Sequence, residues 1–422
     1  IAASASASSS KYGAHTVSLF STFGEGGQNA IGPELYEEMG AIRARETMAA
    51  SEIQGSEPHF LGLKDFGFSK SADEAFKFWG REEALRRMVL EIRRLRPDVI
   101  ITNHSVTSND HGHHQATARM VVEAFDAAAD ASKFPEQLKD GVTTWQVQRL
   151  FVRVRGNQPP GADTPIVSID PNERDPVRGT VFAEQALSAL QKHATQGPWP
   201  KSFTEYMARF RAFSGQGGAA GQMPAIRYRL AREAKGGDPT PKEPKTFLDG
   251  LPAPQVAGKQ FAAPTVDGKP LTDFVDQRDK LVDALMASTQ PTDSPISVYG
   301  SAESRVGRMQ ARLYTALAAA IGVSAKLSSR QILIPGEAAS VEVEFTNRGK
   351  ETVRIEKVSA VLDRMNTVKP VNAMLNSGAT TKVQLTVRLP RDLAVTVPHA
   401  KHLYEQRFAG LPVYAVAGIE FK

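Results

Sequence analysis

A short segment rich in histidine carries the strongest chemical signal in this sequence. Three of the chain's nine histidines, His111, His113 and His114, lie within four residues and directly follow Asp110. His111 and His114 are three residues apart at the expected start of a helix, so both imidazoles can face one point. The positive end of a helix favours neutral imidazole, which is the form that binds a metal ion.

Asp110 and the absence of cysteine limit which residues could bind a metal ion. Because the chain has no cysteine, a metal ion here has to be held by His, Asp or Glu. Asp110 is placed to accept a ring N–H and to orient a histidine, as carboxylates do around zinc. The simpler alternative is a polar loop whose histidines cap the helix and contact solvent, and the cluster alone does not decide between the two.

Residues 24–29 read GEGGQN and form a second candidate site. The backbone N–H groups of Gly26 and Gly27, together with the Glu25 carboxylate, could approach a substrate closely. The alternative is that the glycines serve a tight turn with positive φ angles. A phosphate-binding loop is disfavoured, because the segment lacks the Lys and the Ser or Thr of a P-loop.

Three further charged residues stand near these segments in the sequence. Arg43 and Glu46 are three residues apart on a predicted helix, which is typical of a modest surface pair. Asp65 lies in the stretch LKDFGFSK. From the residues alone, each is more often structural than catalytic.

The elements that position these residues alternate between strand-like and helix-like segments over the first 200 residues. This rhythm predicts an α/β fold with a Rossmann-like, mostly parallel sheet flanked by helices. Ligands bind outside the carboxyl ends of parallel strands, so the glycine-rich and histidine-rich segments are expected on one rim of the sheet. The apolar run 99–101 predicts a strand buried on both faces. The predicted strands are 17–22, 98–103, 147–154 and 165–170, and the predicted helices are 33–50, 71–96 (begun by a Ser71–Glu74 capping box), 111–128 and 182–193.

The composition changes twice along the chain and predicts three regions. Residues 1–213 form the α/β domain, and residues 214–328 form a Pro- and Gly-rich connector with a helical region. Residues 329–422 alternate apolar and polar side chains in short stretches, which predicts a β-sandwich. A length of 422 residues is consistent with two or three domains.

Charge and hydropathy exclude several classes of protein. The net charge of +5 comes from scattered Lys and Arg residues without a basic stripe, so we expect no nucleic-acid partner. The longest nearly apolar run, residues 313–323, is about half the ~20 residues that a membrane helix needs. We therefore expect a globular protein without a transmembrane segment.

Several stretches in order resemble the LmbE-like, or PIG-L, deacetylase family, in the form of its large bacterial members with C-terminal domains. The resemblance covers nearly the whole chain, and each match is weak taken alone. The matching stretches are TFGEGGQNAIGPEL at 22–35, Ile42-Arg43 with Glu46, DFGFSK at 65–70, RPDVI at 96–100, DHGHHQA at 110–116, HATQG at 193–197, FLDG at 247–250 and PGE at 335–337.

The resemblance implies hydrolysis of the N-acetyl group of an N-acetylglucosamine-type sugar or conjugate with one Zn²⁺ ion. It implies that His114 is a zinc ligand and that His111 helps to stabilise the tetrahedral oxyanion, and we place Asp110 with His111 as catalytic. Members with similar sandwiches are exported, so we expect a periplasmic or extracellular location, with a cytoplasmic one left open. The residues predicted to bind substrate are Glu25, Gly26, Gly27, Asn29, Arg43, Asp65 and His193.

One departure from the family pattern bears on activity. The family's other two zinc ligands and its general base belong to an AHPDDE-like motif at the end of a first strand, and no such motif precedes Gly24. His15 stands alone without neighbouring aspartates, so we give it no such role. We expect that a first strand is missing from this sequence. The alternative is a catalytically inactive relative that binds glycans or a cell surface.

Overall fold

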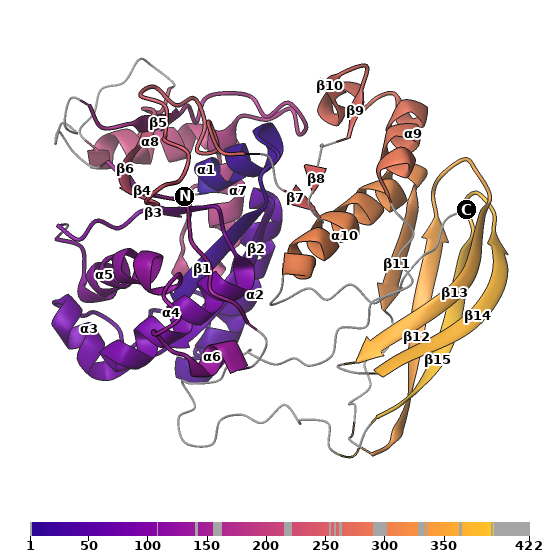
Figure 1. The fold of residues 1–422 in the computed structure, drawn as a ribbon, viewed down its shortest axis with the longest axis horizontal. Coiled ribbons are helices and arrows are strands. Elements are labelled where there is room, and N and C mark those ends of the chain that lie inside the picture. The colour runs from indigo at the N-terminus through magenta and orange to yellow at the C-terminus, as the bar shows by residue number, and fades with distance from the viewer. Residues whose placement is uncertain are drawn as a thin grey trace. The chain divides into compact units, whose positions relative to one another are not determined.

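The structure is a computed structural model that divides into two units. It describes residues 2–107, 109–139, 142–154, 163–214, 222–252, 255–256, 259–260, 264–289, 302–327, 334, 336–362, 365–389 and 391. The described residues up to 252 form the first unit, and those from 255 onward form the second (Figure 1). None of the described helices is long and apolar enough to cross a membrane.

The first unit alternates strands with helices, as its sequence predicts. Its strands are β1 (Thr16–Thr22), β2 (Ser56–Leu63), β3 (Val99–Thr102), β4 (Arg149–Arg153), β5 (Ile166–Ile169) and β6 (Ile226–Glu233). Its α-helices are α1 (Ala2–Ser6), α2 (Tyr36–Gln54), α3 (Ala72–Trp79), α4 (Arg81–Leu95), α5 (Gly112–Ala127), α6 (Glu136–Lys139), α7 (Phe182–Gln191) and α8 (Phe203–Ser214). A π-helical turn, Ala7–Lys11, follows α1, and a 3₁₀ turn, Ala194–Gln196, follows α7.

The sheet arrangement is mixed α/β and differs from the predicted single, mostly parallel sheet. β1 and β2 form a parallel pair, and a separate sheet has the order β3-β4-β6-β5. In the second sheet β3 and β4 are parallel, whereas β6 is antiparallel to both β4 and β5. The difference arises because β6 inserts between β4 and β5, from a segment that the sequence predicts to be connecting chain.

β3 also departs from the prediction of a strand buried on both faces. Val99 and Ile100 are only half-buried, and Ile101 is exposed. Among the described strands β3 pairs with β4 alone, so it lies at an edge of its sheet. The apolar run therefore predicts the position of the strand correctly, but the prediction that both of its faces are buried is wrong.

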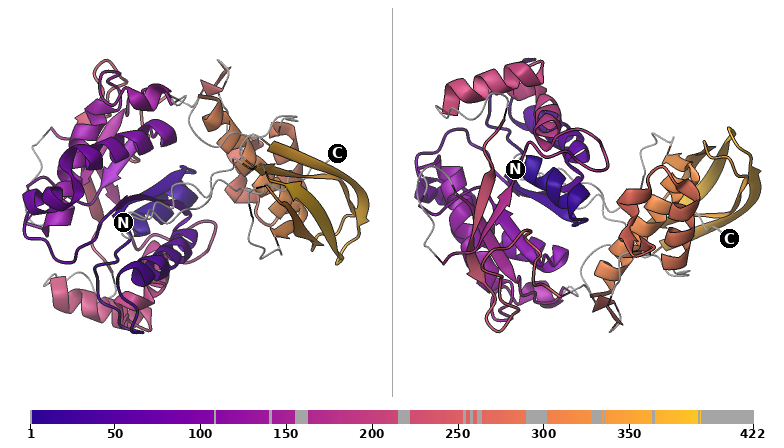
Figure 2. Two further views of the ribbon diagram at one scale, coloured as in Figure 1. Left: turned by 90° about the horizontal axis from the view of Figure 1, so that it is seen from below. Right: turned by 90° about the horizontal axis from the view of Figure 1, so that it is seen from above.

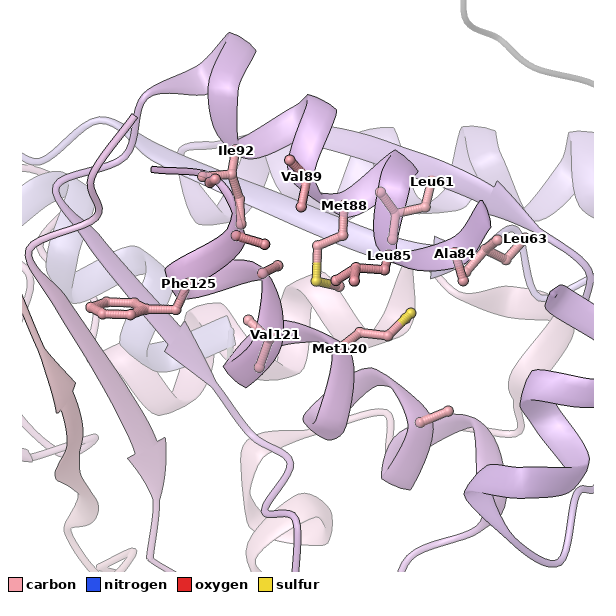
Figure 3. Packing of buried hydrophobic residues seen from close by; sticks show 14 of the residues in the cluster. Leu61, Leu63, Ala84, Leu85, Met88, Val89, Ile92, Met120, Val121 and Phe125 are labelled. Carbon is pink, nitrogen blue, oxygen red and sulfur yellow. The ribbon is translucent and has the colours of Figure 1, made fainter. Parts of the chain in front are cut away.

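Helices cover both faces of the second sheet (Figure 2). Side chains alternate between the two faces of a strand, and the neighbouring residues Leu150 and Phe151 on β4 belong to different core clusters. Leu150 packs with residues of α3, α4 and α5, and Phe151 packs with residues of α1 and α7. Figure 3 shows the first of these clusters, to which Met88 and Ile92 of α4 and Met120 of α5 belong.

The long helix predicted for 71–96 is two helices. Ser71 caps α3 as predicted, because its Oγ accepts a hydrogen bond from the Glu74 N–H at 3.2 Å. The chain then breaks at Gly80, whose φ of 70° is unfavourable for other residues. As a result α3 and α4 pack on α5 with separate apolar faces, and Phe78, predicted as part of one stripe, is exposed.

The first unit extends beyond the predicted boundary at residue 213. β6 completes the second sheet, and Phe247 is buried against Phe151 and Tyr228. The buried guanidinium of Arg149 donates to the carbonyl of Asp249 at 2.6 Å. Residues between 226 and 250 therefore pair and pack with the rest of the α/β unit. The Pro- and Gly-rich composition of this part of the chain gives no sign of these contacts.

The second unit contains helices followed by antiparallel strands. The short pairs β7 (Gln255–Val256) with β8 (Lys259–Gln260) and β9 (Thr265–Val266) with β10 (Lys269–Pro270) precede a 3₁₀ turn (Leu271–Phe274), α9 (Arg278–Ser288) and α10 (Ala302–Ile321). β11 (Val323–Leu327), β12 (Ala338–Asn347) and β15 (Thr380–Arg388) form one sheet, and β13 (Val353–Leu362) pairs with β14 (Met365–Leu375).

Apolar residues of both sheets share one core in the second unit. Phe345 of β12 and Leu385 of β15 are buried in the same cluster as Ile355 of β13 and Leu375 of β14. The alternation predicted from the sequence is therefore present. A β-sandwich over residues 329–422 stays a prediction, because residues 392–422 lie outside the described part of the chain.

Candidate metal centre

Two histidines and an aspartate converge where β3 ends and α5 begins. His104 follows β3 by two residues, Asp110 precedes α5, and His114 lies in its first turn. Each offers one ligand atom, and the three ligand atoms lie within 4.8 Å of one another. Two imidazoles and a carboxylate are a donor set that zinc accepts, so these residues fit a divalent ion of that kind.

The histidine rings of this region are stacked. The His104 and His114 ring centroids are 4.3 Å apart with an interplanar angle of 19°, and those of His111 and His114 are 4.7 Å apart at 12°. The Asp110 Oδ2 lies 3.7 Å from the His104 Nδ1. His111 therefore lies directly beside the three candidate ligand residues His104, Asp110 and His114, which are called the metal group below. The spacing of His111 and His114 predicts this proximity.

The third histidine of the cluster belongs to the core. His113 is buried with its ring stacked on Trp79 at 5.1 Å and edge-on to Phe66 at 4.4 Å. Burial lowers the pKa of His113 to about 4, and the nearby charges of His111 and His114 act in the same direction. His113 therefore stays neutral and fixes the first turn of α5 against α3.

Arg43 holds the glycine-rich loop from within. Its Nη1 donates to the Gly24 carbonyl at 2.6 Å, and its Nη2 donates to the Gln28 carbonyl at 2.7 Å. Its Nε donates to the Thr195 Oγ1 at 3.3 Å, and Glu46 accepts from the Thr195 N–H and Oγ1 at 2.8 and 2.6 Å. Arg43 and Glu46 are therefore members of a buried network, in contrast to the surface pair that their spacing suggests.

The glycine-rich loop lies against the loop that contains Asp65. The Glu25 Oε1 accepts from the Asp65 N–H at 2.8 Å, and a Cβ on Gly26 would overlap the backbone of Asp65 and Gly67. Burial raises the pKa of Glu25 to about 7. Burial likewise raises the pKa of Asp65, although Arg43, His111 and His114 oppose that rise.

The predicted substrate residues therefore fall into two groups. In the first group, Glu25 and Gly26 contact the Asp65 loop, and Arg43 binds the glycine-rich loop. Asp65 also reaches α5, where its Oδ1 is 4.0 Å from the His113 Nδ1. Gly27 packs against the Arg43 guanidinium.

The second group consists of Asn29 and His193. The Asn29 side chain is used locally, because its Nδ2 donates to the Glu34 carboxylate at 3.0 Å and its Oδ1 accepts from the Ile31 N–H at 3.1 Å. His193 is half-buried, and burial lowers its pKa while Glu46 opposes that shift. Both residues border the Arg43–Thr195 network, and neither is one of the three ligand residues of the metal group.

Sequence reasoning misses three residues of this region. His104 follows a predicted strand, and its place at a carboxyl end was the available signal. Thr195 and Ser69 lie inside stretches that carry the family resemblance, but their partners are far away in the chain. The Thr195 N–H donates a hydrogen bond to Glu46, which is 149 residues away in the sequence. The Ser69 hydroxyl accepts one from the His113 N–H, which is 44 residues away.

The first unit contains the part of the chain that matches a known family. The model of the PIG-L family, described as GlcNAc-PI de-N-acetylase, matches residues 1–125, which contain the glycine-rich loop and the whole metal group. Residues 1–125 resemble the PIG-L family. The match runs from before β1 to residue 125, two residues before the end of α5.

Curated relatives of this PIG-L-like segment carry deacetylase and amidase names. A 1D-myo-inositol 2-acetamido-2-deoxy-alpha-D-glucopyranoside deacetylase of Geodermatophilus obscurus is 27% identical over 221 residues, which are 44% of this chain and 74% of that protein. The protein of the same name from Streptomyces avermitilis is 27% identical over 227 residues, or 44% of this chain and 76% of its own length. A mycothiol S-conjugate amidase of Streptomyces coelicolor is 28% identical over 131 residues, which are 30% of this chain and 44% of that protein.

A solved structure with a related name was also found. The N,N'-diacetylchitobiose deacetylase from Pyrococcus horikoshii is 16% identical, and the match covers 55% of this chain and 78% of that one. Its TM-score of 0.39 is too low to support an argument about this chain.

Proposed function

We propose that this chain is a zinc-dependent hydrolase that removes the N-acetyl group from an N-acetylglucosamine-type sugar or conjugate. The observation that carries the proposal is the convergence of His104, Asp110 and His114 ligand atoms within 4.8 Å, beside the loops that match the PIG-L model. The names of the relatives supply the reaction and the class of substrate.

We assign His104, Asp110 and His114 as the residues that hold the ion. Asp110 is thereby moved from a catalytic role to a ligand role, because its carboxylate lies with the two imidazoles rather than apart from them. When bound, zinc supplies Lewis-acid chemistry suited to amide hydrolysis.

The neighbouring side chains have distinct proposed tasks. His111, stacked on His114, donates a hydrogen bond to the carbonyl oxygen of the N-acetyl group, where negative charge develops. Asp65 and the backbone of Gly26 and Gly27 contact the sugar. Arg43 acts on them indirectly, since it shapes the glycine-rich loop through the Gly24 and Gln28 carbonyls.

The remaining predicted contacts stay part of the proposal. Glu25 supports the Asp65 loop through its bond to the Asp65 N–H. Asn29 and His193 flank the same network and are assigned to the distal part of the conjugate. Their places beside Glu34 and Glu46 leave them outside the metal group itself.

The test measures bound metal and released acetate in the same preparations. The full chain is supplied with zinc, dialysed and assayed for zinc content, together with His104→Ala, His114→Ala and a control, His15→Ala. His15 is a suitable control because it binds Glu57 at 3.1 Å and is not one of the three ligand residues. Acetate release is followed on an N-acetylglucosaminyl inositol.

We expect about one zinc per chain in the parent and in His15→Ala, and a loss of at least about tenfold in both ligand variants. Acetate release should fall in parallel. Equal zinc content in all four proteins would remove the metal assignment. A chain that binds the sugar conjugate but retains no zinc and releases no acetate would overturn the hydrolase proposal in favour of glycan binding.

A further inference from the structure

Ser69 is a fully buried serine that joins the Asp65 loop to the start of α5. Its Oγ accepts a hydrogen bond from the His113 N–H at 2.8 Å, and its carbonyl accepts from the Gly112 N–H at 2.7 Å. The same Oγ lies 3.2 Å from the Nδ1 of His111. Two of the N–H groups that a helix leaves unpaired at its start are thus satisfied by one residue.

Gly112 is required for this close approach. A Cβ at Gly112 would overlap the carbonyl oxygen of Ser71 and would come within 2.7 Å of the Ser69 Oγ. Overlap with backbone cannot be relieved by a side-chain rotation. The glycine between His111 and His113 therefore lets the 69–71 segment lie directly against the first turn of α5.

The donors around the His111 Nδ1 determine which ring nitrogen carries the proton. The His113 N–H also points at this Nδ1, at 3.3 Å, so Nδ1 acts as an acceptor. A serine hydroxyl has one hydrogen and two lone pairs. Because one lone pair of the Ser69 Oγ already accepts from the His113 N–H, its hydrogen is available to the His111 Nδ1.

When the Ser69 hydroxyl donates to Nδ1 together with the His113 N–H, that nitrogen carries no proton of its own. In neutral imidazole one nitrogen is a donor and the other is an acceptor. The proton of His111 is then on Nε2, at the opposite side of the ring. The ring plane is fixed at the same time, because it stacks on His114 at 4.7 Å and 12°.

We propose that Ser69 is a positioning residue that locks His111 as the Nε2–H tautomer and aims this N–H at the carbonyl oxygen of the substrate amide. The proposal deepens the proposed hydrolase function and rests on it for the identity of the substrate. Ser69 itself touches neither the substrate nor the ligand atoms of the metal group. It acts through the hydrogen bond to His111 alone.

The primary test is spectroscopic and does not depend on activity. Protein labelled with ¹⁵N-histidine is examined by two-bond ¹H–¹⁵N correlation NMR at pH 8, and His111→Asn identifies the His111 signals. We expect the parent to give the Nε2–H pattern, with the Nδ1 resonance displaced by the hydrogen bond from Ser69. Ser69→Ala should move the Nδ1 resonance toward that of a nitrogen without this donor and should increase the fraction of the Nδ1–H form.

Ser71→Ala is the matched control. It removes a serine hydroxyl two residues away that caps α3 by accepting from the Glu74 N–H. It should lower stability by a similar helix-cap effect but leave the His111 signals unchanged. Ser69→Thr keeps a hydroxyl and should restore the parent Nδ1 resonance, which separates the hydrogen bond from a general packing effect.

Kinetics supply a second readout that distinguishes the two proposals. If acetate is released, Ser69→Ala should lower kcat by about 10- to 100-fold with little change in KM, and Ser71→Ala should not. Absence of acetate release in the parent would remove the hydrolase function while the NMR result still judges the role of Ser69. An Nδ1–H form of His111 in the parent, or identical Nδ1 resonances in the parent and in Ser69→Ala, would overturn the inference.

Discussion

Glu25 gives the sharpest prediction, because its carboxyl group is buried in the protein yet close to the proposed site. The residue is 4% exposed, and one carboxyl oxygen accepts a hydrogen bond from the Asp65 N–H. Burial raises the pKa of Glu25 from about 4.5 in the unfolded chain to about 7. Folding therefore favours the protonated form, and ionisation of this group costs stability.

The sign and size of the effect follow from linkage. A carboxyl group with a raised folded pKa binds more protons in the folded state, so its contribution to stability declines as the pH rises from 4.5 toward 7. The difference of about 2.5 pKa units corresponds to about 3 kcal/mol in total. Most of this decline, about 2 to 3 kcal/mol, falls between pH 5 and pH 8.

Glu25→Gln removes the ionisation while keeping the shape and an oxygen that can accept from the Asp65 N–H. We expect the free energy of unfolding of the variant to decline less between pH 5 and pH 8 than that of the parent, by about 2 to 3 kcal/mol. The assay is urea unfolding of metal-free protein followed by tryptophan fluorescence. All three tryptophans, Trp79, Trp145 and Trp199, lie in the first unit, so the signal reports on that unit alone.

The comparison between the two pH values contains its own control. Any constant effect of the substitution cancels, since only the change with pH is compared. A pH dependence that is the same in the parent and in Glu25→Gln would refute the reasoning. It would mean that the Glu25 carboxylate is ionised and hydrated in the folded protein despite its position.

The same unfolding assay tests two further features of the first unit. The ring of His59 lies between Glu57 and Glu91, at 3.0 and 3.1 Å; burial opposes the shift, but the two carboxylates raise its pKa to about 9. The stabilisation from these ion pairs is full below pH 6.5 and is lost as the pH rises through about 9. His59→Gln should therefore reduce the decline in the free energy of unfolding over that range by about 1 to 2 kcal/mol, allowing for the exposure of Glu57. An equal decline in both proteins would contradict the ion pairs. Arg93 is fully buried and donates to five backbone carbonyls near the end of α5, so Arg93→Met should lower the free energy of unfolding by about 3 to 5 kcal/mol. Its half-buried neighbour Arg94 bonds only Glu91 among the pairs described, so Arg94→Met should change the free energy of unfolding by less than about 0.5 kcal/mol. Similar losses in the two variants would disprove the role of the buried bonds.

Local patterns in the sequence were sufficient for much of the first unit. Hydrophobic runs predicted β1, β3, β4 and β5 to within one or two residues, and the Ser71 cap was predicted from two residue types alone. The three-residue spacing of His111 and His114 predicted that both imidazoles face one point, and in the structure their rings are stacked at the start of α5. Such features depend on residues close together in the chain, and the period of a helix or strand is enough to relate them.

The partners of those elements were decided by the tertiary structure. The Gly- and Pro-rich composition around β6 hid a strand that inserts between β4 and β5, because strand neighbours are chosen by long-range hydrogen bonding and packing. The spacing of Arg43 and Glu46 suggested a surface pair, but the fold buries both against Thr195, about 150 residues away.

The candidate metal group shows the same division. The sequence by itself determined that imidazoles and a carboxylate stand together at the start of a helix. Only the fold brought His104 from the end of β3 to Asp110 and His114, and only the fold set Ser69 against His111. Residue types define which chemistry is available, whereas ligand geometry depends on distances between backbone segments that local periodicity does not encode.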